Sequence, residues 1–235
     1  MIRAILFDKD GTFTDFRQTW ERWMPGPIRE LARETGAPPD VLADVIGFDL
    51  EAGVIRPDGR FVTATNAETG AAIAELVGWD ADRIRRWWDL RVMEVEQVPV
   101  TDLAPLLHDI AGRGLALGVL TNADESEARI HLAHLGILDH FAQVIGYDSG
   151  WGAKPGHHGA LAFAEGLGLR PQEVVVVGDG MTDMLAAKGA GMRAVAVLTG
   201  TLDHAALAPH AEVVLPDVSH LPAWLDAQEI SLQTA

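Results

Sequence analysis

The sequence predicts an α/β fold, a doubly wound parallel-sheet core of the Rossmann type with an α-helical domain inserted after its first strand. Three observations predict it. Apolar runs of strand length at residues 2–7, 115–120 and 173–177 are typical of strands buried on both faces of a parallel sheet. From residue 101 onward strand-like and helix-like segments alternate, which is the pattern of βαβ units. Between residues 16 and 97 the apolar residues recur at helical spacing instead.

The remaining elements follow in order along the chain. Pro99 marks the end of the inserted region, because proline fixes its own φ and biases Val98 away from helix. We therefore expect a core domain of residues 1–15 plus 99–235 and a helical cap domain of residues 16–98. Within the core, further strands are expected at residues 143–146, 193–197 and 212–215, and helices at residues 103–111, 125–135, 158–167, 182–188 and 221–226.

Composition and charge limit the classes of partner. The chain of 235 residues is 48% hydrophobic, which suffices for a packed core. Its formal net charge of −16 argues against nucleic acid or an anionic membrane surface as a partner, since both attract clustered Lys and Arg. No apolar run reaches the roughly 20 residues of a membrane span, and no secretory signal pattern opens the chain, so we expect a cytoplasmic protein. The absence of cysteine excludes disulfides and thiolate catalysis.

Carboxylates follow two of the predicted strands directly. Asp8 and Asp10, separated by one residue, come after the first strand, and Asp179 and Asp183 follow the strand at residues 173–177. Open α/β sheets bind ligands at the carboxyl ends of their strands. Asp and Gly are also the commonest turn residues, so the first pair taken alone is equally typical of a turn.

Four motifs, read together, resemble those of the haloacid dehalogenase superfamily of phosphohydrolases. They stand in that superfamily's order: DKDGT at residues 8–12, Thr121 after the strand at residues 115–120, Lys154 within GWGAKPGHHG, and GDGMTD at residues 178–183. The resemblance implies a core with a helical cap between the first and second motifs. By cap position and motif spacing the phosphoglycolate phosphatase-like group is the most similar, which implies small phosphorylated metabolites as substrates.

The resemblance also implies a role for each motif residue. Asp8 resembles the nucleophile that forms an aspartyl phosphate, and Asp10 resembles the general acid and base. Thr121 resembles the residue that binds the phosphoryl oxygens, with Asn122 as a further side-chain donor. Lys154 resembles the lysine that neutralises the charge building up on these oxygens in the transition state.

A magnesium ion is the implied cofactor. Asp8, Asp179 and the backbone carbonyl of Asp10 resemble its ligands, and Asp183 resembles a residue that orients metal-bound water or the lysine. Mg²⁺ prefers such oxygen ligands. The predicted metal site therefore consists of Asp8, Asp10, Asp179 and Asp183, although Asp179 on its own is also typical of a turn.

The predicted activity is Mg²⁺-dependent hydrolysis of a small phosphate monoester, either phosphoglycolate-like or a sugar phosphate, with the oligomeric state left open between monomer and dimer. A phosphosugar mutase is the alternative, because it shares Asp8 and Asp10 and differs in returning the phosphoryl group to a sugar. A non-catalytic binding protein is a third interpretation, for which loss of a motif acid would be expected. The acid at Asp10 argues against dehalogenation, and phosphonate cleavage is set aside because no lysine lies between residues 16 and 100.

The predicted cap gives weaker signals for substrate selectivity. Several arginines and tryptophans are candidates, but their pattern is more typical of a solvated helix face and of core packing than of ligands. His157 and His158 follow the motif lysine and are more typical of a helix start. The cap candidates are Arg17, Arg56, Arg60, Arg83, Arg85, Arg86, Trp87 and Trp88.

Overall fold

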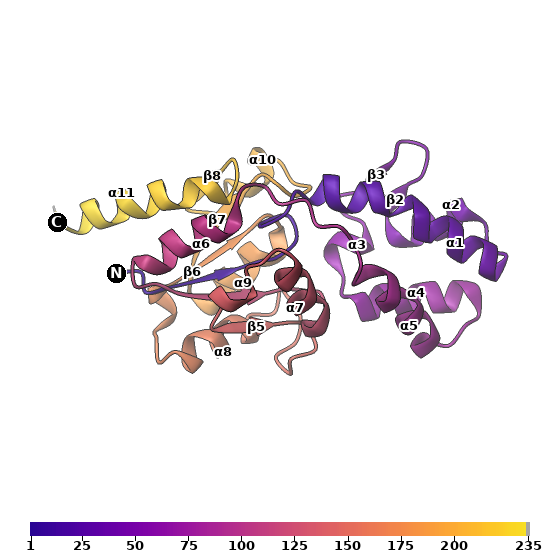
Figure 1. Ribbon diagram of the computed structural model, residues 1–235, viewed down its shortest axis with the longest axis horizontal. Coiled ribbons are helices and arrows are strands. Elements are labelled where there is room, and N and C mark those ends of the chain that lie inside the picture. Colours follow the sequence, from indigo (N-terminus) through magenta and orange to yellow (C-terminus); the bar gives the residue numbers. More distant parts are fainter. Residues whose placement is uncertain (234–235) are drawn as a thin grey trace.

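The computed structural model describes residues 1–233, with side chains through residue 228. Figure 1 shows two lobes side by side. One lobe contains a β-sheet covered by helices and carries the N-terminus together with the last described helix. The other lobe is built mainly of helices from the region between the first and second strands of that sheet.

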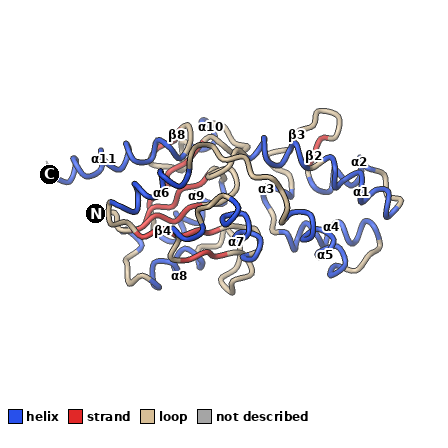
Figure 2. Tube along the Cα trace, viewed as in Figure 1, coloured by secondary structure: helices blue, strands red, loops and turns tan. Residues whose placement is uncertain are grey.

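The first lobe is organised around six strands. They are β1 (Ala4–Phe7), β4 (Ala116–Leu120), β5 (Gln143–Ile145), β6 (Val174–Gly178), β7 (Arg193–Val197) and β8 (Val213–Leu215). All are parallel, in the order β5-β4-β1-β6-β7-β8 (Figure 2). Phe7, the last residue of β1, pairs in register with Val119 and Val177, so the carboxyl ends of β1, β4 and β6 open at one edge. The predicted doubly wound parallel core is confirmed.

Helices cover both faces of this sheet. They are α6 (Leu103–Gly112), α7 (Glu125–His134), α8 (His158–Gly166), α9 (Met181–Ala190), α10 (His204–Leu207) and α11 (Leu221–Gln233). Alternate residues of a strand point to opposite faces. Ile5 and Phe7 accordingly pack with α6, α7 and α11, whereas Ala4 and Leu6 pack with α8, α9 and α10. The helix expected at residues 221–226 continues to Gln233. Single turns η2 (Leu138–His140), η3 (Pro171–Glu173) and η4 (Val218–His220) complete this lobe.

The second lobe has an apolar core of its own. Its helices are η1 (Arg17–Glu21), α1 (Pro25–Thr35), α2 (Pro39–Ile46), α3 (Arg60–Thr63), α4 (Asn66–Val77) and α5 (Ala81–Val92). Every buried residue of its apolar cluster lies between Phe16 and Val95, within the predicted cap. The region whose apolar residues recur at helical spacing in the sequence thus forms a separately packed apolar cluster. The division into two independent domains at residues 15 and 99 stays a prediction.

A short antiparallel hairpin in the second lobe was not expected from the sequence. It consists of β2 (Phe48–Asp49) and β3 (Val54–Ile55), with Phe48 paired to Ile55 and both buried. Strands of two residues are too short to show the alternation that identifies a strand in a sequence. Gly53 closes the turn with a φ of 72°, in the left-handed region that glycine adopts without strain.

Two connections join the lobes and run side by side. The Asp15 N–H donates to the Val98 carbonyl at 2.9 Å, and the Val100 N–H donates to the Phe13 carbonyl at 3.0 Å. These bonds hold the exit and the return of the inserted segment next to each other. Pro99 lies there, as the sequence predicts.

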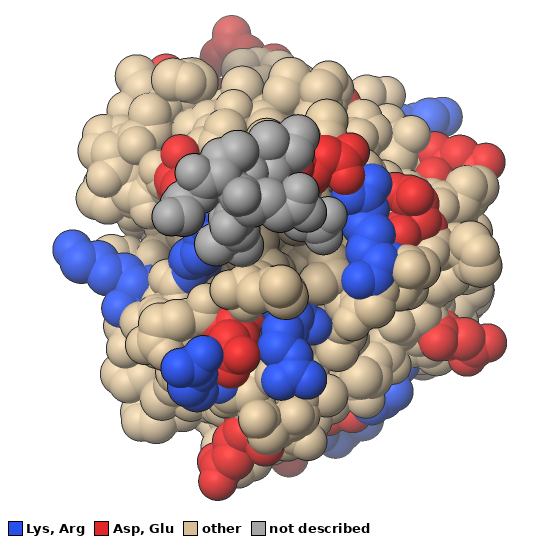
Figure 3. Space-filling view, turned by 90° about the vertical axis from the view of Figure 1, so that its left-hand side faces the viewer, with Lys and Arg blue, Asp and Glu red and all other residues tan. Residues whose placement is uncertain are grey.

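The surface charge of the sheet lobe is mixed. Figure 3 shows its end far from the helical lobe, where Lys and Arg side chains stand next to Asp and Glu side chains. Ion pairs in this lobe join Arg193 to Glu212 and Arg113 to Asp226. Among the described residues, no helix has both the length and the hydropathy needed to traverse a lipid bilayer.

Candidate active site

Three carboxylates meet where β1 and β6 end. Asp8 directly follows β1, Asp179 directly follows β6, and Asp183 lies in the first turn of α9. One oxygen of each lies within 4.8 Å of the others, and all three residues are buried. Two glycines leave room for them, because a Cβ on Gly200 would lie 1.7 Å from Asp179 Oδ2 and one on Gly11 would lie 2.5 Å from the same oxygen.

A single buried lysine joins this cluster from the loop between β5 and α8. Lys154 Nζ lies 2.6 Å from Asp8 Oδ1 and 2.6 Å from Asp183 Oδ1. Asn122, just after β4, holds the backbone of this lysine with both ends of its amide. Its Nδ2 donates to the Lys154 carbonyl at 2.9 Å, and its Oδ1 accepts from the Lys154 N–H at 2.8 Å. These contacts hold the lysine at a fixed position relative to the ends of β1 and β4.

Burial sets the electrostatics of the cluster. It raises the pKa of Asp8 to about 6, with the nearby ammonium of Lys154 acting in the opposite direction. Burial, together with repulsion from Asp8 and Asp183, raises the pKa of Asp179 well above its ordinary value. Burial alone would lower the pKa of Lys154, but attraction to Asp183 and Asp8 raises it above its usual range. The lysine is charged at neutral pH.

The donor set of the cluster fits a hard divalent cation. Three buried carboxylates face one ammonium, which leaves an excess of negative charge away from water. Such an excess is unfavourable unless it is balanced. Carboxylate oxygens within a few ångströms of one another are the ligands that hard cations prefer. Asp8, Asp179 and Asp183 could hold such an ion.

Asp10 lies beside this cluster, and its carboxylate faces other partners. Lys9 Nζ lies 2.9 Å from both carboxylate oxygens of Asp10, and the Trp20 indole N–H donates to Oδ1 at 3.2 Å. Gly11, directly after Asp10, has a φ of 77°, and Asp10 lines the cavity between the two lobes. The side chain of Asp10 therefore belongs to the boundary between the two lobes.

Lys9 is the centre of a buried polar network that the sequence analysis missed. Its ammonium is fully buried, 2.9 Å from His131 Nδ1 and 3.6 Å from Glu127 Oε1. His131 Nε2 lies 2.8 Å from the Val92 carbonyl oxygen. A carbonyl oxygen only accepts, so we assign the proton of His131 to Nε2, which leaves Nδ1 to accept from Lys9. Burial raises the pKa of Glu127 to about 7, and burial with the charge of Lys9 lowers that of His131 to about 4.

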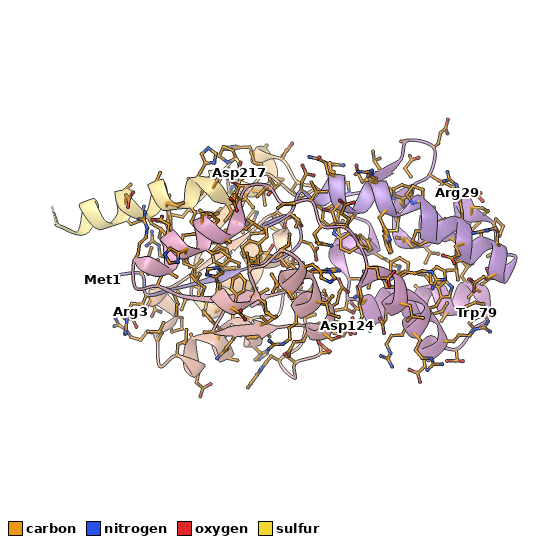
Figure 4. All side chains as sticks on the ribbon, viewed as in Figure 1. Met1, Arg3, Arg29, Trp79, Asp124 and Asp217 are labelled. Carbon is orange, nitrogen blue, oxygen red and sulfur yellow. The ribbon has the colours of Figure 1, made fainter. Side chains whose placement is uncertain are left out.

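The same network joins the two lobes. Asn66, the first residue of α4, donates from Nδ2 to Asp124 Oδ2 at 3.0 Å and to Glu127 Oε2 at 2.7 Å. Asp124 also accepts from the Tyr147 hydroxyl at 3.0 Å. Figure 4 labels Asp124 where the sheet lobe meets the helical lobe. Asn66 thus connects the helical lobe to the buried Glu127 of α7 and to the half-buried Asp124 of the loop before it.

A small cavity of about 80 Å³ lies between the two lobes, and all the site residues predicted from the sequence line it. Thr121 lines it at the end of β4, where its hydroxyl accepts from the Ala123 N–H at 3.1 Å. The wall from the sheet lobe includes Asp8, Asp10, Thr121, Asn122, Glu127, Lys154, Asp179 and Asp183. The wall from the helical lobe and its connections consists of Phe16, Trp20, Phe61, Val62, Ala64, Asn66 and Val92.

The arginines and tryptophans considered for selectivity are not among the described residues that line this cavity. Arg83 stacks on Trp79, which Figure 4 labels at the far end of the helical lobe. Trp87 and Trp88 are buried in the apolar cluster of that lobe. The cavity is instead lined from this lobe by residues that include Trp20, Phe61, Val62 and Asn66. The helical spacing of these residues in the sequence does not indicate that they face a ligand. His157 stacks on His158 at the start of α8.

Comparison with known proteins gives the family. The model of the haloacid dehalogenase-like hydrolases matches residues 2–191. A phosphoglycolate phosphatase of Rhodospirillum rubrum is 35% identical over 96% of this chain and 91% of its own length. The crystal structure of a predicted phosphoglycolate phosphatase from Haemophilus somnus has a TM-score of 0.72 at 17% identity, covering 95% of this chain and 98% of that one. β-Phosphoglucomutase from Clostridium difficile has a TM-score of 0.70 at 20% identity, with all of both chains covered.

The fold and the buried acids at its strand ends are those of a hydrolase with a Rossmann-like core. This chain belongs to the haloacid dehalogenase-like hydrolases, as its motifs predict. At the level of enzyme class, the family and its curated relatives confirm the prediction of a phosphoric monoester hydrolase. The two solved structures share less than 25% identity with this chain, so they support its fold alone.

Proposed function

We propose that this protein hydrolyses a small phosphate monoester through an aspartyl phosphate on Asp8, with Mg²⁺ as its cofactor. The meeting of three buried carboxylates with one buried ammonium, at the carboxyl edge of a parallel sheet, carries the proposal. Open α/β sheets bind ligands at this edge. The activity named for the Rhodospirillum rubrum relative supports phosphate monoesters as the substrate class.

The proposed ion would be held by Asp8, Asp179 and the backbone carbonyl of Asp10, with Asp183 beside them. When bound, Mg²⁺ supplies positive charge that offsets the charge of the phosphoryl oxygens. Asp183 has a second task, because its Oδ1 accepts from Lys154 Nζ and its Oδ2 accepts from the Gly180 N–H at 3.0 Å. It therefore orients the lysine from a carboxylate that α9 holds in place.

Asp8 and Asp10 perform the covalent steps of this proposal. A carboxylate oxygen of Asp8 forms a bond to phosphorus while the bond from phosphorus to the ester oxygen breaks. The leaving alcohol oxygen takes its proton from Asp10. Water then attacks phosphorus and gives a proton to Asp10, and the bond between phosphorus and Asp8 breaks. Inorganic phosphate leaves, and both side chains return to their initial state.

Lys154 and Thr121 bind the phosphoryl oxygens during these steps. The ammonium of Lys154 already lies 2.6 Å from the carboxylate that attacks, so it can neutralise charge on an oxygen of the transferring group. For Asn122 we propose a positioning role instead of the side-chain donor role expected from the sequence. Both ends of its amide bind the Lys154 backbone, so we assign it the positioning of that lysine.

Trapping the covalent intermediate tests the proposal. The protein is incubated briefly with Mg²⁺ and para-nitrophenyl phosphate, quenched in acid and treated with borohydride, which reduces an aspartyl phosphate to homoserine. Peptide mass spectrometry should find homoserine at position 8. Homoserine at another position, or phosphate release without any trapped species at position 8, would refute Asp8 as nucleophile. Phosphate release without an added sugar bisphosphate distinguishes a phosphatase from the mutase alternative.

A further inference from the structure

The two walls of the cavity differ in chemistry. The sheet-lobe wall is acidic with one lysine, whereas the helical-lobe wall is made of aromatic and aliphatic side chains with one amide, Asn66. The phosphoryl group must lie at the sheet-lobe wall, where Asp8 and Lys154 are. The organic part of the substrate therefore faces the helical-lobe wall, and the chemistry of that wall selects it.

Charge around the cavity as a whole is one-sided. Among the described residues that line the cavity, Lys154 is the only Lys or Arg, and it pairs with Asp8 and Asp183. Glu127 adds a buried acid next to Asn66, with 3% of its side chain exposed. Lys9 lies close by, but it is fully buried behind the cavity and contacts Asp10, Glu127 and His131 instead.

The side-chain donors of the helical-lobe wall are already in use. Asn66 has two amide hydrogens, and its Nδ2 donates to Asp124 and to Glu127. Trp20 has one indole N–H, which donates to Asp10. Among the described side chains of this wall, the remaining members are Phe16, Phe61, Val62, Ala64 and Val92, which have no polar hydrogen.

These contacts lead to a statement about the substrate, which rests on the proposed phosphatase function. We infer that the preferred substrate is the phosphate monoester of a compact alcohol whose organic part carries no negative charge. A carboxylate at the helical-lobe wall would lose its water without a cation or a free side-chain donor to replace it, and it would face Glu127. The side-chain carbonyl oxygen of Asn66 can accept a hydrogen bond from a substrate hydroxyl at the helical-lobe wall.

The size of the cavity points to a compact alcohol. Its volume of about 80 Å³ is smaller than the roughly 150 Å³ of an engineered protein cavity that holds one benzene molecule. Phosphoglycolate is small enough in this respect, but its carboxylate does not match the wall. Selectivity in this chain therefore differs from the activity named for its curated relatives.

Matched pairs of phosphate esters test the inference. In each pair a carboxylate replaces a hydroxymethyl group: phosphoglycolate against hydroxyethyl phosphate, phosphoglycerate against glycerol phosphate, and para-carboxyphenyl against para-hydroxymethylphenyl phosphate. Phosphate release with Mg²⁺ gives kcat/KM for every compound that turns over. We expect the hydroxymethyl member to exceed its carboxylate partner by roughly 100-fold in each pair that is hydrolysed.

The outcomes separate the inference from the function on which it rests. Equal rates within a pair, or a faster carboxylate member, would overturn the inference and leave the phosphatase function in place. No turnover of any of these esters would overturn the phosphatase function, and the inference with it. A kcat/KM ratio of the hydroxymethyl member to the carboxylate member that exceeds one and lies near the expected value supports a substrate with an uncharged organic part.

A substitution in the helical-lobe wall tests the location of the effect. Val62→Arg supplies the missing cation, and Val62→Met is the matched control of similar length without charge. We expect Val62→Arg to shift the ratio of each pair toward its carboxylate member by roughly 10-fold, with Val62→Met close to wild type. An equal shift in both variants, or none in Val62→Arg, would contradict selection at this wall. The wild-type ratios decide the inference even if a variant fails to fold.

Discussion

At the scale of single residues, the site depends on charges that burial makes sensitive to their neighbours. Burial raises the pKa of Asp8, and the ammonium of Lys154 at 2.6 Å opposes that rise. The two side chains thus determine each other's charge, since the carboxylates also raise the pKa of the lysine. Removing one member changes the state of the rest as well as its own contacts.

Replacing Asp8 should separate chemistry from folding. Asp8→Asn keeps the size of the side chain and removes the nucleophile together with one of three crowded negative charges. We expect phosphate release to fall by roughly 10⁴-fold or more, with the far-ultraviolet circular dichroism unchanged. Asp40→Asn, at an exposed aspartate of α2, is the matched control and should keep full activity. Near-normal turnover in Asp8→Asn would contradict the nucleophile assignment.

Gly200 tests whether space around Asp179 matters. A Cβ at this position would lie 1.7 Å from Asp179 Oδ2, so Gly200→Ala must displace the carboxylate or the loop after β7. We expect a loss of roughly 100-fold in activity at low Mg²⁺ that high Mg²⁺ partly restores, measured by titrating Mg²⁺ against phosphate release. Gly112→Ala is the matched control, because nothing lies within 4 Å of its added Cβ. An unchanged Mg²⁺ dependence in Gly200→Ala would count against Asp179 as a ligand.

Glu127 gives a prediction for stability against pH. Its pKa is raised from 4.5 to about 7, so the folded state binds a proton that the unfolded state releases as pH rises. The free energy of unfolding therefore falls as pH increases from about 5 to about 7, by up to about 3 kcal/mol from this group. Lys9, Asp10, Asp124 and His131 face Glu127, and the buried neutral His131 acts in the opposite sense between about pH 4 and 6.5.

The Glu127→Gln variant isolates the contribution of the acid. It keeps the side-chain size and an oxygen that can accept from Asn66, but it does not titrate. Denaturant unfolding at a series of pH values should show the variant gaining stability relative to wild type as pH rises from about 5 to 8. A difference that stays constant over this range would contradict the raised pKa of Glu127.

The sequence could predict the acids of the site but not the network behind them. Asp8 and Asp179 follow apolar strands directly, and parallel register brings such ends together, so their meeting follows from local pattern. Lys9 and Glu127 meet across 118 positions of the chain, because α7 packs beside the turn after β1. Helical spacing identifies α7 as a helix but does not show that its inner face carries Glu127 and His131.

At the scale of elements, two loops of the sheet lobe depend on each other. Asn122, directly after Thr121, binds the backbone of Lys154, so the loop after β4 and the loop between β5 and α8 are joined through Asn122. The apolar runs predict these strands well, since buried strands leave a clear signal. The hairpin of β2 and β3 leaves none, because two residues a strand are too few for a periodic pattern.

Asn122→Ala tests this joining of the loops. It removes both hydrogen bonds to the Lys154 backbone and leaves the lysine side chain in place. We expect kcat to fall by roughly 10 to 100-fold with little change in KM, because the lysine acts mainly on the transition state. Steady-state kinetics on one matched ester provide the measurement. A rise in KM alone would favour the original interpretation of Asn122 as a direct phosphate donor.

At the scale of the whole molecule, the helical lobe completes the site that the sheet lobe begins. Trp20 and Val92 bind Asp10 and His131, and Asn66 binds two acids of the sheet lobe. The apolar clusters of the two lobes are nevertheless separate. The chain passes between the lobes twice, through two backbone segments that lie next to each other. The inserted lobe should therefore contribute more to selectivity than to the folding of the sheet.

Deleting residues 16–97 and joining the ends with a short Gly-Ser linker tests this division of labour. We expect a folded core that unfolds cooperatively, because both apolar clusters on the sheet lie outside the deleted segment. Its Mg²⁺-dependent phosphate release should be weak, since Asp10 loses Trp20 and water enters the site. The preference within each matched ester pair should shrink toward equality, because the wall that opposes a carboxylate is gone. A core that cannot fold alone would argue against two domains, whereas a folded core that keeps the full preference would place selectivity in the sheet lobe.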